Sequence, residues 1–191
     1  MTKGRLEAFS DGVIAIIITI MVLELKIPHG TAWADLGPLI PTFLSYGLSF
    51  VVLGIYWTNH HHMIHVVKTV TGTILWANLH LLFWLSVVPF VTAWMGENHY
   101  AAIPVALYGF VLFMAGFAFT ILAHLLVRHE GPDSTLAKAV GRNHKRKISQ
   151  AGYALGIVAA FFMPAIGLAF YVAVALMWFV PDRRIEKQAE V

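Results

Sequence analysis

Long blocks of apolar residues run along the whole chain, and short polar segments separate them. The blocks predict helices at about residues 4–25, 38–62, 73–95 and 100–127, followed by one further apolar stretch from 148 to 180. A helix needs ~20 mostly apolar residues to cross the hydrocarbon core of a bilayer, and each of the first four blocks is long enough. The pattern therefore predicts an all-α polytopic membrane protein.

The last apolar stretch has two interpretations, because Pro164-Ala165-Ile166-Gly167 interrupts it. We expect two short helices, at about 148–163 and 166–181, although the stretch is short for two spans of ~20 residues each. One long helix kinked at Pro164 is the alternative. The two interpretations place the C-terminus on opposite sides of the membrane.

The distribution of basic residues favours six spans. Six spans put the lysines and arginines of both termini, Lys68 and the basic loop 128–147 on one side of the membrane, and only Lys26 on the other. Cytoplasmic segments of membrane proteins are enriched in Lys and Arg. Five spans would leave Arg183 and Arg184 outside. We therefore predict six transmembrane helices with both termini in the cytoplasm.

Composition supports a membrane protein with one domain. Of the 191 residues, 59% are hydrophobic and 12% are charged, whereas soluble domains are about half apolar and about a quarter charged. The spans need nearly the whole length, so we expect a single domain over residues 1–191. The absence of cysteine excludes disulfides and thiolate metal sites. The net charge of +3 follows from topology, and we expect no nucleic-acid partner.

The first predicted span carries polar residues in its opening turns, among them Asp11. A charged group is costly in lipid, so this acid is expected to face protein or water. On a wheel of 3.6 residues per turn, Glu7 and Asp11 fall on the side towards the other helices of the bundle. The opposite side forms one narrow line of Arg5, Phe9, Gly12, Ile16, Thr19, Ile20 and Leu23. The pattern alone is also typical of a tightly packed membrane helix.

The second span ends in a histidine cluster, Asn59-His60-His61-His62 with His65. A metal-dependent membrane hydroxylase would need several such clusters with carboxylates, and no Asp or Glu lies close in sequence. We therefore expect no metal site, no catalytic residue and no enzyme. A buried carboxylate needs hydrogen-bond donors, and this end of the span lies on the same side as Asp11. We predict a polar network drawn from Ser10, Asp11, Trp57, Asn59, His60, His61 and Asn78.

The run Arg5-x-x-x-Phe9-Ser10-Asp11, followed by Gly12-Val13-x-Ala15-Ile16, resembles the first-helix signature of the transmembrane protein 175 family of potassium channels. The Trp/Asn/His cluster that ends the second span agrees with the resemblance. It implies a bacterial-type homotetramer in the inner membrane, with the first helix of each copy lining a central pore. Its filter would be apolar side chains that begin five residues after the Asp, at Ile16, and continue at Thr19 or Ile20 and Leu23. The permeant potassium ion is the expected ligand, without a cofactor.

The resemblance implies a channel with a modest preference for potassium over sodium. A ring of apolar side chains offers no substitute for hydration water, and it can also close by dewetting. Three alternatives remain open. A proton-coupled transporter would use Asp11 and the cluster His60–His62 as a relay, a histidine-metal enzyme would retain bound metal, and a scaffold protein would show no flux.

Overall fold

The chain forms a bundle of long helices in a computed structural model that describes residues 3–134, 136–137 and 144–179. These residues form six α-helices and one 3-10 helix: α1 Lys3–Val22, η1 Trp33–Leu39, α2 Ile40–His65, α3 Gly72–Glu97, α4 Ala102–Glu130, α6 His144–Ala160 and α7 Pro164–Phe179. Three segments are long and apolar enough to cross a membrane, namely Trp33–His65, Gly72–Glu97 and Ala102–Glu130. The all-α prediction with six helices is confirmed.

Helix α1 ends earlier than its predicted limit at residue 25, and the difference has a local cause. After Val22 the chain tightens, and the Leu23 N–H donates to the Ile20 carbonyl at 2.9 Å, an i to i−3 bond. The predicted connection to the second span also contains η1, which leads directly into α2. The Asp35 carboxylate accepts from the Ala32 N–H at 2.8 Å and so satisfies a free donor at the start of η1.

The last apolar stretch forms two helices rather than one kinked helix. Helix α6 ends at Ala160, and α7 begins at Pro164, where a proline in the first helical turn loses no backbone hydrogen bond. The two helices pack against each other. A Cβ placed on Gly167 would lie 2.8 Å from the Gly156 carbonyl oxygen, so this close crossing depends on glycine.

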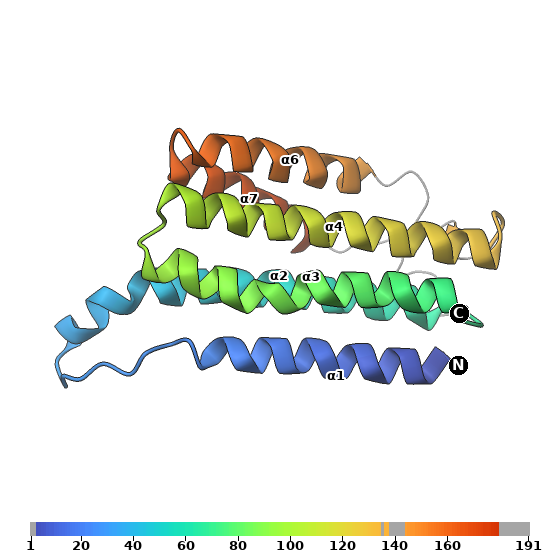
Figure 1. The fold of residues 1–191 in the computed structure, drawn as a ribbon, viewed down its shortest axis with the longest axis horizontal. Helices are drawn as coiled ribbons and strands as arrows, with labels where there is room; N and C mark the ends of the chain where they lie inside the picture. The colour runs from blue at the N-terminus through green and yellow to red at the C-terminus, as the bar shows by residue number, and fades with distance from the viewer. Residues whose placement is uncertain (1–2, 135, 138–143, 180–191) are drawn as a thin grey trace.

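Figure 1 shows the α-helices aligned along one long axis, with α1 at one edge of the bundle and α6 at the other. Helix α1 packs against α2 and α3, while α4 packs against α3, α6 and α7. Successive helices run in opposite directions, so α1, α3 and α6 begin at the end of the bundle where α2 and α4 finish. We call this the basic end, because Lys3, Arg5, Lys68, Arg128 and Lys145 lie there.

The opposite end of the bundle carries a single lysine and no arginine among the described parts of the chain, namely Lys26. Its ammonium group lies 2.6 Å from the Glu97 carboxylate, at the end of α3. The hydrogen bond to Glu97 and the charge of that carboxylate raise the pKa of Lys26. The helices thus have strongly unequal charge at their two ends, which is the asymmetry that orients membrane proteins.

A buried set of hydroxyl groups joins the central helices. Ser49 of α2 lies 2.7 Å from the Thr92 hydroxyl of α3 and 3.0 Å from the Tyr108 hydroxyl of α4. All three side chains are buried. Each hydroxyl finds a partner on another helix, so the apolar core contains these polar atoms without leaving them unpaired.

We predict that Gly96→Ala destabilises the protein. A Cβ at this position would lie 2.7 Å from the Thr42 Cα, so the backbones of α3 and α2 would have to separate. Forcing extra volume into a packed contact costs about 1–3 kcal/mol. Thermal unfolding in detergent should show a lower midpoint for Gly96→Ala. Gly72→Ala, at the other end of the same helix, has open space around its Cβ and should leave the midpoint unchanged. Equal midpoints for all three proteins would contradict the prediction.

Candidate ion pathway and its supporting polar network

Helix α1 has two faces with different surroundings. Leu6, Ser10, Ile14, Ile17 and Met21 recur every three or four residues, and all five are buried against the rest of the bundle. The opposite face is exposed in the single chain, with exposed fractions of 58% for Ile16 and 45% for Ile20, and Leu23, in the turn just after α1, is 77% exposed. Phe9, Gly12 and Thr19 are exposed along the same line. The predicted pore residues therefore share one uncovered face.

Thr19 is the hydroxyl-bearing residue within this apolar line. Its Oγ1 donates to the Ile16 carbonyl at 2.9 Å, so the hydroxyl proton is engaged within the helix. A hydroxyl oxygen keeps acceptor capacity when its proton is donated. The exposed side of Thr19 therefore presents an oxygen acceptor to whatever lies against this face of α1.

A buried hydrogen-bonded group holds the opposite face of α1. The Asn78 amide nitrogen of α3 donates to the Ser10 hydroxyl oxygen at 2.9 Å, and Ser10 in turn donates to the Leu6 carbonyl at 2.8 Å. The Asn78 oxygen lies 2.7 Å from His60 Nε2 of α2. Because that oxygen can only accept, His60 donates through Nε2. Asn78 thus joins α1, α2 and α3 at one buried point.

A second set of polar contacts runs between α1 and α2. The Trp57 indole N–H donates to Asp11 Oδ1 at 3.0 Å, and Glu7 lies 3.3 Å from His61 Nδ1. The Lys3 ammonium group donates to the His65 carbonyl. From one contact to the next, the residue number rises by four on α1 and falls by four on α2, as expected for antiparallel helices with contacts one turn apart. Three turns of α1 are therefore tied to three turns of α2.

Most of the predicted network residues come together, in two separate groups whose pairings the sequence did not predict. Among the described residues Asp11 bonds to Trp57 and to no histidine, while His61 pairs with Glu7. Glu7 was absent from the predicted network. It lies one turn before Asp11 on the same helical face, so the wheel pattern contained the signal. The partner of each acid followed only from the register of two helices that lie far apart in the chain.

Several known proteins are similar to this chain in sequence or fold. A potassium channel of Chryseobacterium sp. (strain P1-3) is 58% identical over 98% of this chain and 97% of its own length. The family model described as endosomal/lysosomal potassium channel TMEM175 matches residues 5–89, which span α1, α2 and most of α3. The chain belongs to the TMEM175 family. The resemblance seen in the first-helix signature is thereby confirmed.

Two further relatives match nearly the whole chain. A potassium channel of Streptomyces collinus (strain DSM 40733 / Tue 365) is 34% identical over 92% of this chain and 91% of its own length. The crystal structure of a lysosomal potassium-selective channel TMEM175 homolog from Chamaesiphon minutus has a TM-score of 0.82 and 26% identity. That match covers 93% of this chain and 96% of the other. TMEM175 proteins are ion channels, so the chain belongs to a channel family and not to an enzyme family.

Asn59 does not join the network around Asp11 in this TMEM175 chain. It precedes His60 by one residue, and a step of one residue turns a side chain by about 100° around a helix. Its amide donates to the Ile55 carbonyl of its own helix at 2.8 Å. Arg5 and Phe9 also lie apart from the network, on the exposed face of α1, and Arg5 forms no hydrogen bond or ion pair with the described residues.

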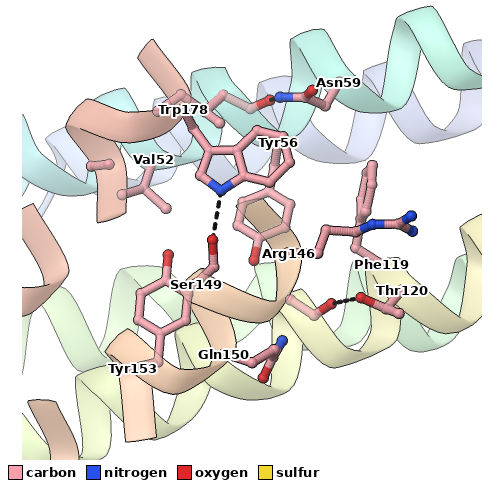
Figure 2. Close-up of a pocket in the computed structure, with 13 residues that line it drawn as sticks. Val52, Tyr56, Asn59, Phe119, Thr120, Arg146, Ser149, Gln150, Tyr153 and Trp178 are labelled. Carbon is pink, nitrogen blue, oxygen red and sulfur yellow. Dashed lines mark hydrogen bonds between the residues drawn. The ribbon is translucent and has the colours of Figure 1, made fainter. Parts of the chain in front are cut away.

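Asn59 instead borders a pocket between α2, α4, α6 and α7 (Figure 2), a cavity of about 50 Å³. The Trp178 indole N–H donates to the Ser149 hydroxyl at 2.7 Å across one wall. Gln150 donates to the Phe113 carbonyl at 3.3 Å, and its side-chain oxygen is buried without a partner among the described residues. Four helices contribute to these walls, so no local sequence pattern predicted the pocket.

We predict that Asn78→Leu destabilises the protein by removing the bridge between α1, α2 and α3. Ser10 and His60 would each lose a buried partner, and every such group left unsatisfied costs about 1–3 kcal/mol. Thermal unfolding in detergent should give a clearly lower midpoint. Ser86→Ala is the matched control, because this exposed hydroxyl on α3 bonds only to the Phe83 carbonyl of its own helix. An Asn78→Leu protein as stable as the control would contradict the bridging role.

Proposed function

We propose that the chain is a potassium-preferring cation channel in which four copies surround a pore lined by α1. The observation that carries the proposal is the uncovered line of Ile16, Thr19 and Ile20 on a helix at the edge of the bundle, which the exposed Leu23 follows in the turn after the helix. The names of its relatives as potassium channels support the choice of ion. In this proposal the six α-helices are the spans of one domain in a bacterial inner membrane.

An oligomer follows from the position of α1. One chain offers a single pore-lining helix, which contacts only one side of its own bundle, and one helix cannot enclose a water-filled path. Several copies arranged with α1 innermost would cover the uncovered face and leave the other helices against lipid. The number four comes from the family resemblance, and the solved homolog is a full-length match in fold. The basic end would face the cytoplasm, with both termini there.

The proposed filter works by dehydration. Rings of Ile16, Ile20 and Leu23 carry no oxygen that could replace the water around an ion, so a passing cation must shed part of its shell. Potassium holds its water less tightly than sodium, and its barrier is therefore lower. Such a filter gives a modest preference. The same rings close the path to water and ions when they move closer together.

Thr19 modifies this apolar path. Its hydroxyl proton is donated to the Ile16 carbonyl, and the residue is exposed. Inside a ring of four copies, this oxygen would offer partial coordination to a dehydrated cation next to the narrowest layer. The Thr19 oxygen would attract cations and repel anions, while the aliphatic side chains beside it set the width of the pore.

The polar network has a positioning role in this mechanism. Asn78 donates a hydrogen bond to Ser10, and Trp57 donates one to Asp11, and these two bonds hold the rotation of α1 about its own axis. A rotation of about 100°, equivalent to one residue, would turn Ile16 away from the axis and bring Ile17 towards it. The network therefore determines which side chains line the pore.

The transporter alternative receives less support from the geometry. A proton relay needs a continuous chain of exchanging groups, and among the described residues no hydrogen bond joins Asp11 to His60 or to His61. Asp11 accepts from an indole, which does not release its proton. The channel is therefore the function that we propose.

Ion flux into liposomes tests the filter. The purified protein should admit potassium faster than sodium, and Ile16→Asn should lower the ratio of the two rates towards unity, because an amide oxygen eases the dehydration of either ion. Ile103→Asn is the matched control, since Ile103 on α4 is 63% exposed, compared with 58% for Ile16, and lies on a helix assigned to lipid. An unchanged ratio in Ile16→Asn, measured on an intact oligomer, would exclude Ile16 as the filter.

Cross-linking tests the arrangement of the four helices. The chain contains no cysteine, so a single introduced thiol reports on its own position. Ile20→Cys should form disulfide-linked dimers under mild oxidation, because the proposed pore brings this position together from several copies. A disulfide requires Cα atoms about 4.4–6.8 Å apart. Ile103→Cys should remain monomeric on a denaturing gel. Equal cross-linking of the two variants, or none in Ile20→Cys, would contradict a pore lined by α1.

A further inference from the structure

Three metal-ligating side chains meet between α1 and α2 at the basic end, outside the group centred on Asn78. They are Glu7 from α1 and His61 and His65 from α2, and one ligand atom from each lies within 4.8 Å of the others. We propose that these three residues bind a divalent transition-metal ion of the Zn²⁺ type. The sequence alone predicts no metal here, because no carboxylate lies close to the histidines along the chain. The fold supplies the carboxylate from another helix.

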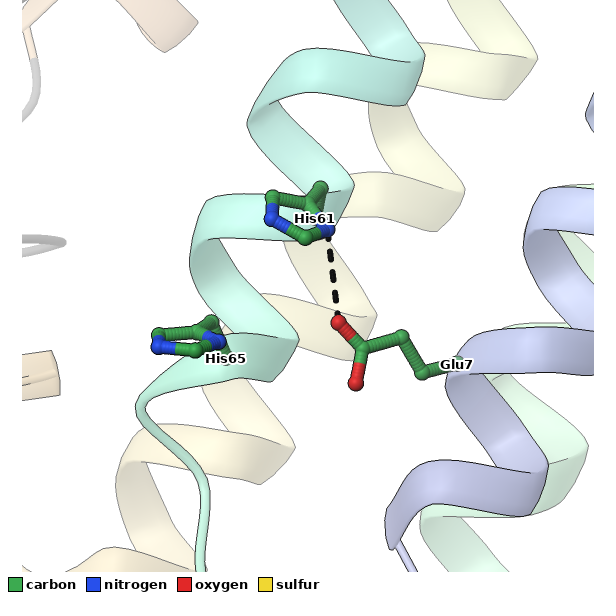
Figure 3. A group of neighbouring side chains, drawn as sticks. All are labelled: Glu7, His61 and His65. Carbon is green, nitrogen blue, oxygen red and sulfur yellow. Dashed lines mark ion pairs between the residues drawn. The ribbon is translucent and has the colours of Figure 1, made fainter.

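The geometry matches the spacing that such an ion requires. Figure 3 shows His61 and His65 one turn apart on α2, with the Glu7 carboxylate reaching towards them from α1. A tetrahedral zinc ion with bonds of about 2.1 Å places its ligand atoms about 3.4 Å apart. Glu7 Oε1 already lies 3.3 Å from His61 Nδ1. The His65 ring is stacked on the His61 ring, and all three ligand atoms lie within 4.8 Å of one another, so side-chain shifts of up to about 1.4 Å would bring them to the tetrahedral spacing.

The donor types select the class of ion. Two imidazoles four residues apart on one helix, with a carboxylate from elsewhere, form a set that binds Zn²⁺ and related first-row ions. Calcium and magnesium prefer oxygen ligands and would find only one carboxylate here. Three protein ligands leave the fourth tetrahedral position to water. The site is therefore a binding site with one open position.

The surroundings allow an ion to enter and hold the ligands in place. His65 is exposed, and the side chains of His61 and Glu7 are 41% and 21% exposed. Trp57 and His62 lie beside His61, with ring centroids 6.1 and 5.9 Å away. The Lys3 ammonium group donates to the His65 carbonyl and so anchors this turn of α2 to α1. The basic end is also where the helices leave the apolar layer.

Binding would tie α1 to α2. The ion takes one ligand from α1 and two from α2, so it favours the arrangement in which the two helices are docked. A ligand that binds only the folded arrangement raises the apparent stability of the protein in proportion to its occupancy. Metal should therefore raise the unfolding temperature, and this readout is independent of ion flux.

The test uses full-length protein without a polyhistidine tag, in detergent at mildly alkaline pH. Co²⁺ serves as the optical probe, since its visible absorption is intense only in tetrahedral sites, and Zn²⁺ is then added to displace it. We expect one ion per chain and a higher unfolding temperature with Zn²⁺. Glu7→Gln and His65→Ala should each weaken binding by at least about tenfold, and each should abolish the thermal shift.

His62→Ala is the matched control, because His62 neighbours the site on the same helix but lies outside the three-residue set. It should bind as the unaltered protein does. Thermal unfolding without metal checks that every variant is folded, and His65→Ala should pass because that side chain is exposed. The proposal is overturned if the unaltered protein shows no tetrahedral cobalt absorption. It is also overturned if His62→Ala weakens binding as much as His65→Ala does, or if Glu7→Gln leaves affinity unchanged.

Discussion

The contact on which the structure most depends is the buried Asn78 amide. Its nitrogen donates to Ser10 of α1, and its oxygen accepts from His60 of α2. Apolar side chains give little preference for one helix contact over another in a bilayer, because lipid tails are as apolar as they are. A buried amide with two specific partners does discriminate. A rotation or slide of α1 that breaks these bonds would leave polar atoms unpaired inside the bundle, which costs about 1–3 kcal/mol per group.

The spacing of the outer contacts adds to this constraint. Lys3, Glu7 and Asp11 occupy successive turns of α1, and they meet His65, His61 and Trp57 on successive turns of α2. A shift of the register by one residue, which turns α1 by about 100°, would break all three contacts together, since Lys3, Glu7 and Asp11 would no longer face α2. A slide by a whole turn would place each of these residues of α1 opposite the wrong residue of α2, and the residue at one end of the row would have no partner. The register of α1 is therefore fixed along its axis as well as around it, and the uncovered face of Ile16 and Ile20 follows from that register.

Much of this arrangement could be predicted from the sequence. The length of the apolar blocks and the positions of Lys and Arg predicted the number of helices, because both can be read from the sequence without knowing which helices contact each other. The helical wheel separated the line of Ile16 and Ile20 from Asp11, since rotation within one helix depends only on 3.6 residues per turn. The break at Pro164 was also readable, because proline tolerates the first turn of a helix and disrupts its interior.

The unpredicted features all depend on how separate helices register against each other. Glu7 was recognised as polar, yet its partner His61 lies 54 positions further along the chain, and nothing local specifies that pairing. Asn59 was predicted in the network as a hydrogen-bond donor near Asp11, whereas the helix turns it by about 100° from His60, and it borders the pocket between α2, α4, α6 and α7. The metal-ligand set has the same origin. A search for carboxylates near the histidines in sequence excludes it, while packing brings Glu7 to them. In two antiparallel helices, a residue further along one helix contacts a residue earlier in the other. Which residues of α1 and α2 meet is set by the Asn78 bridge and by the contacts beside it, and the sequence of either helix alone does not contain that information.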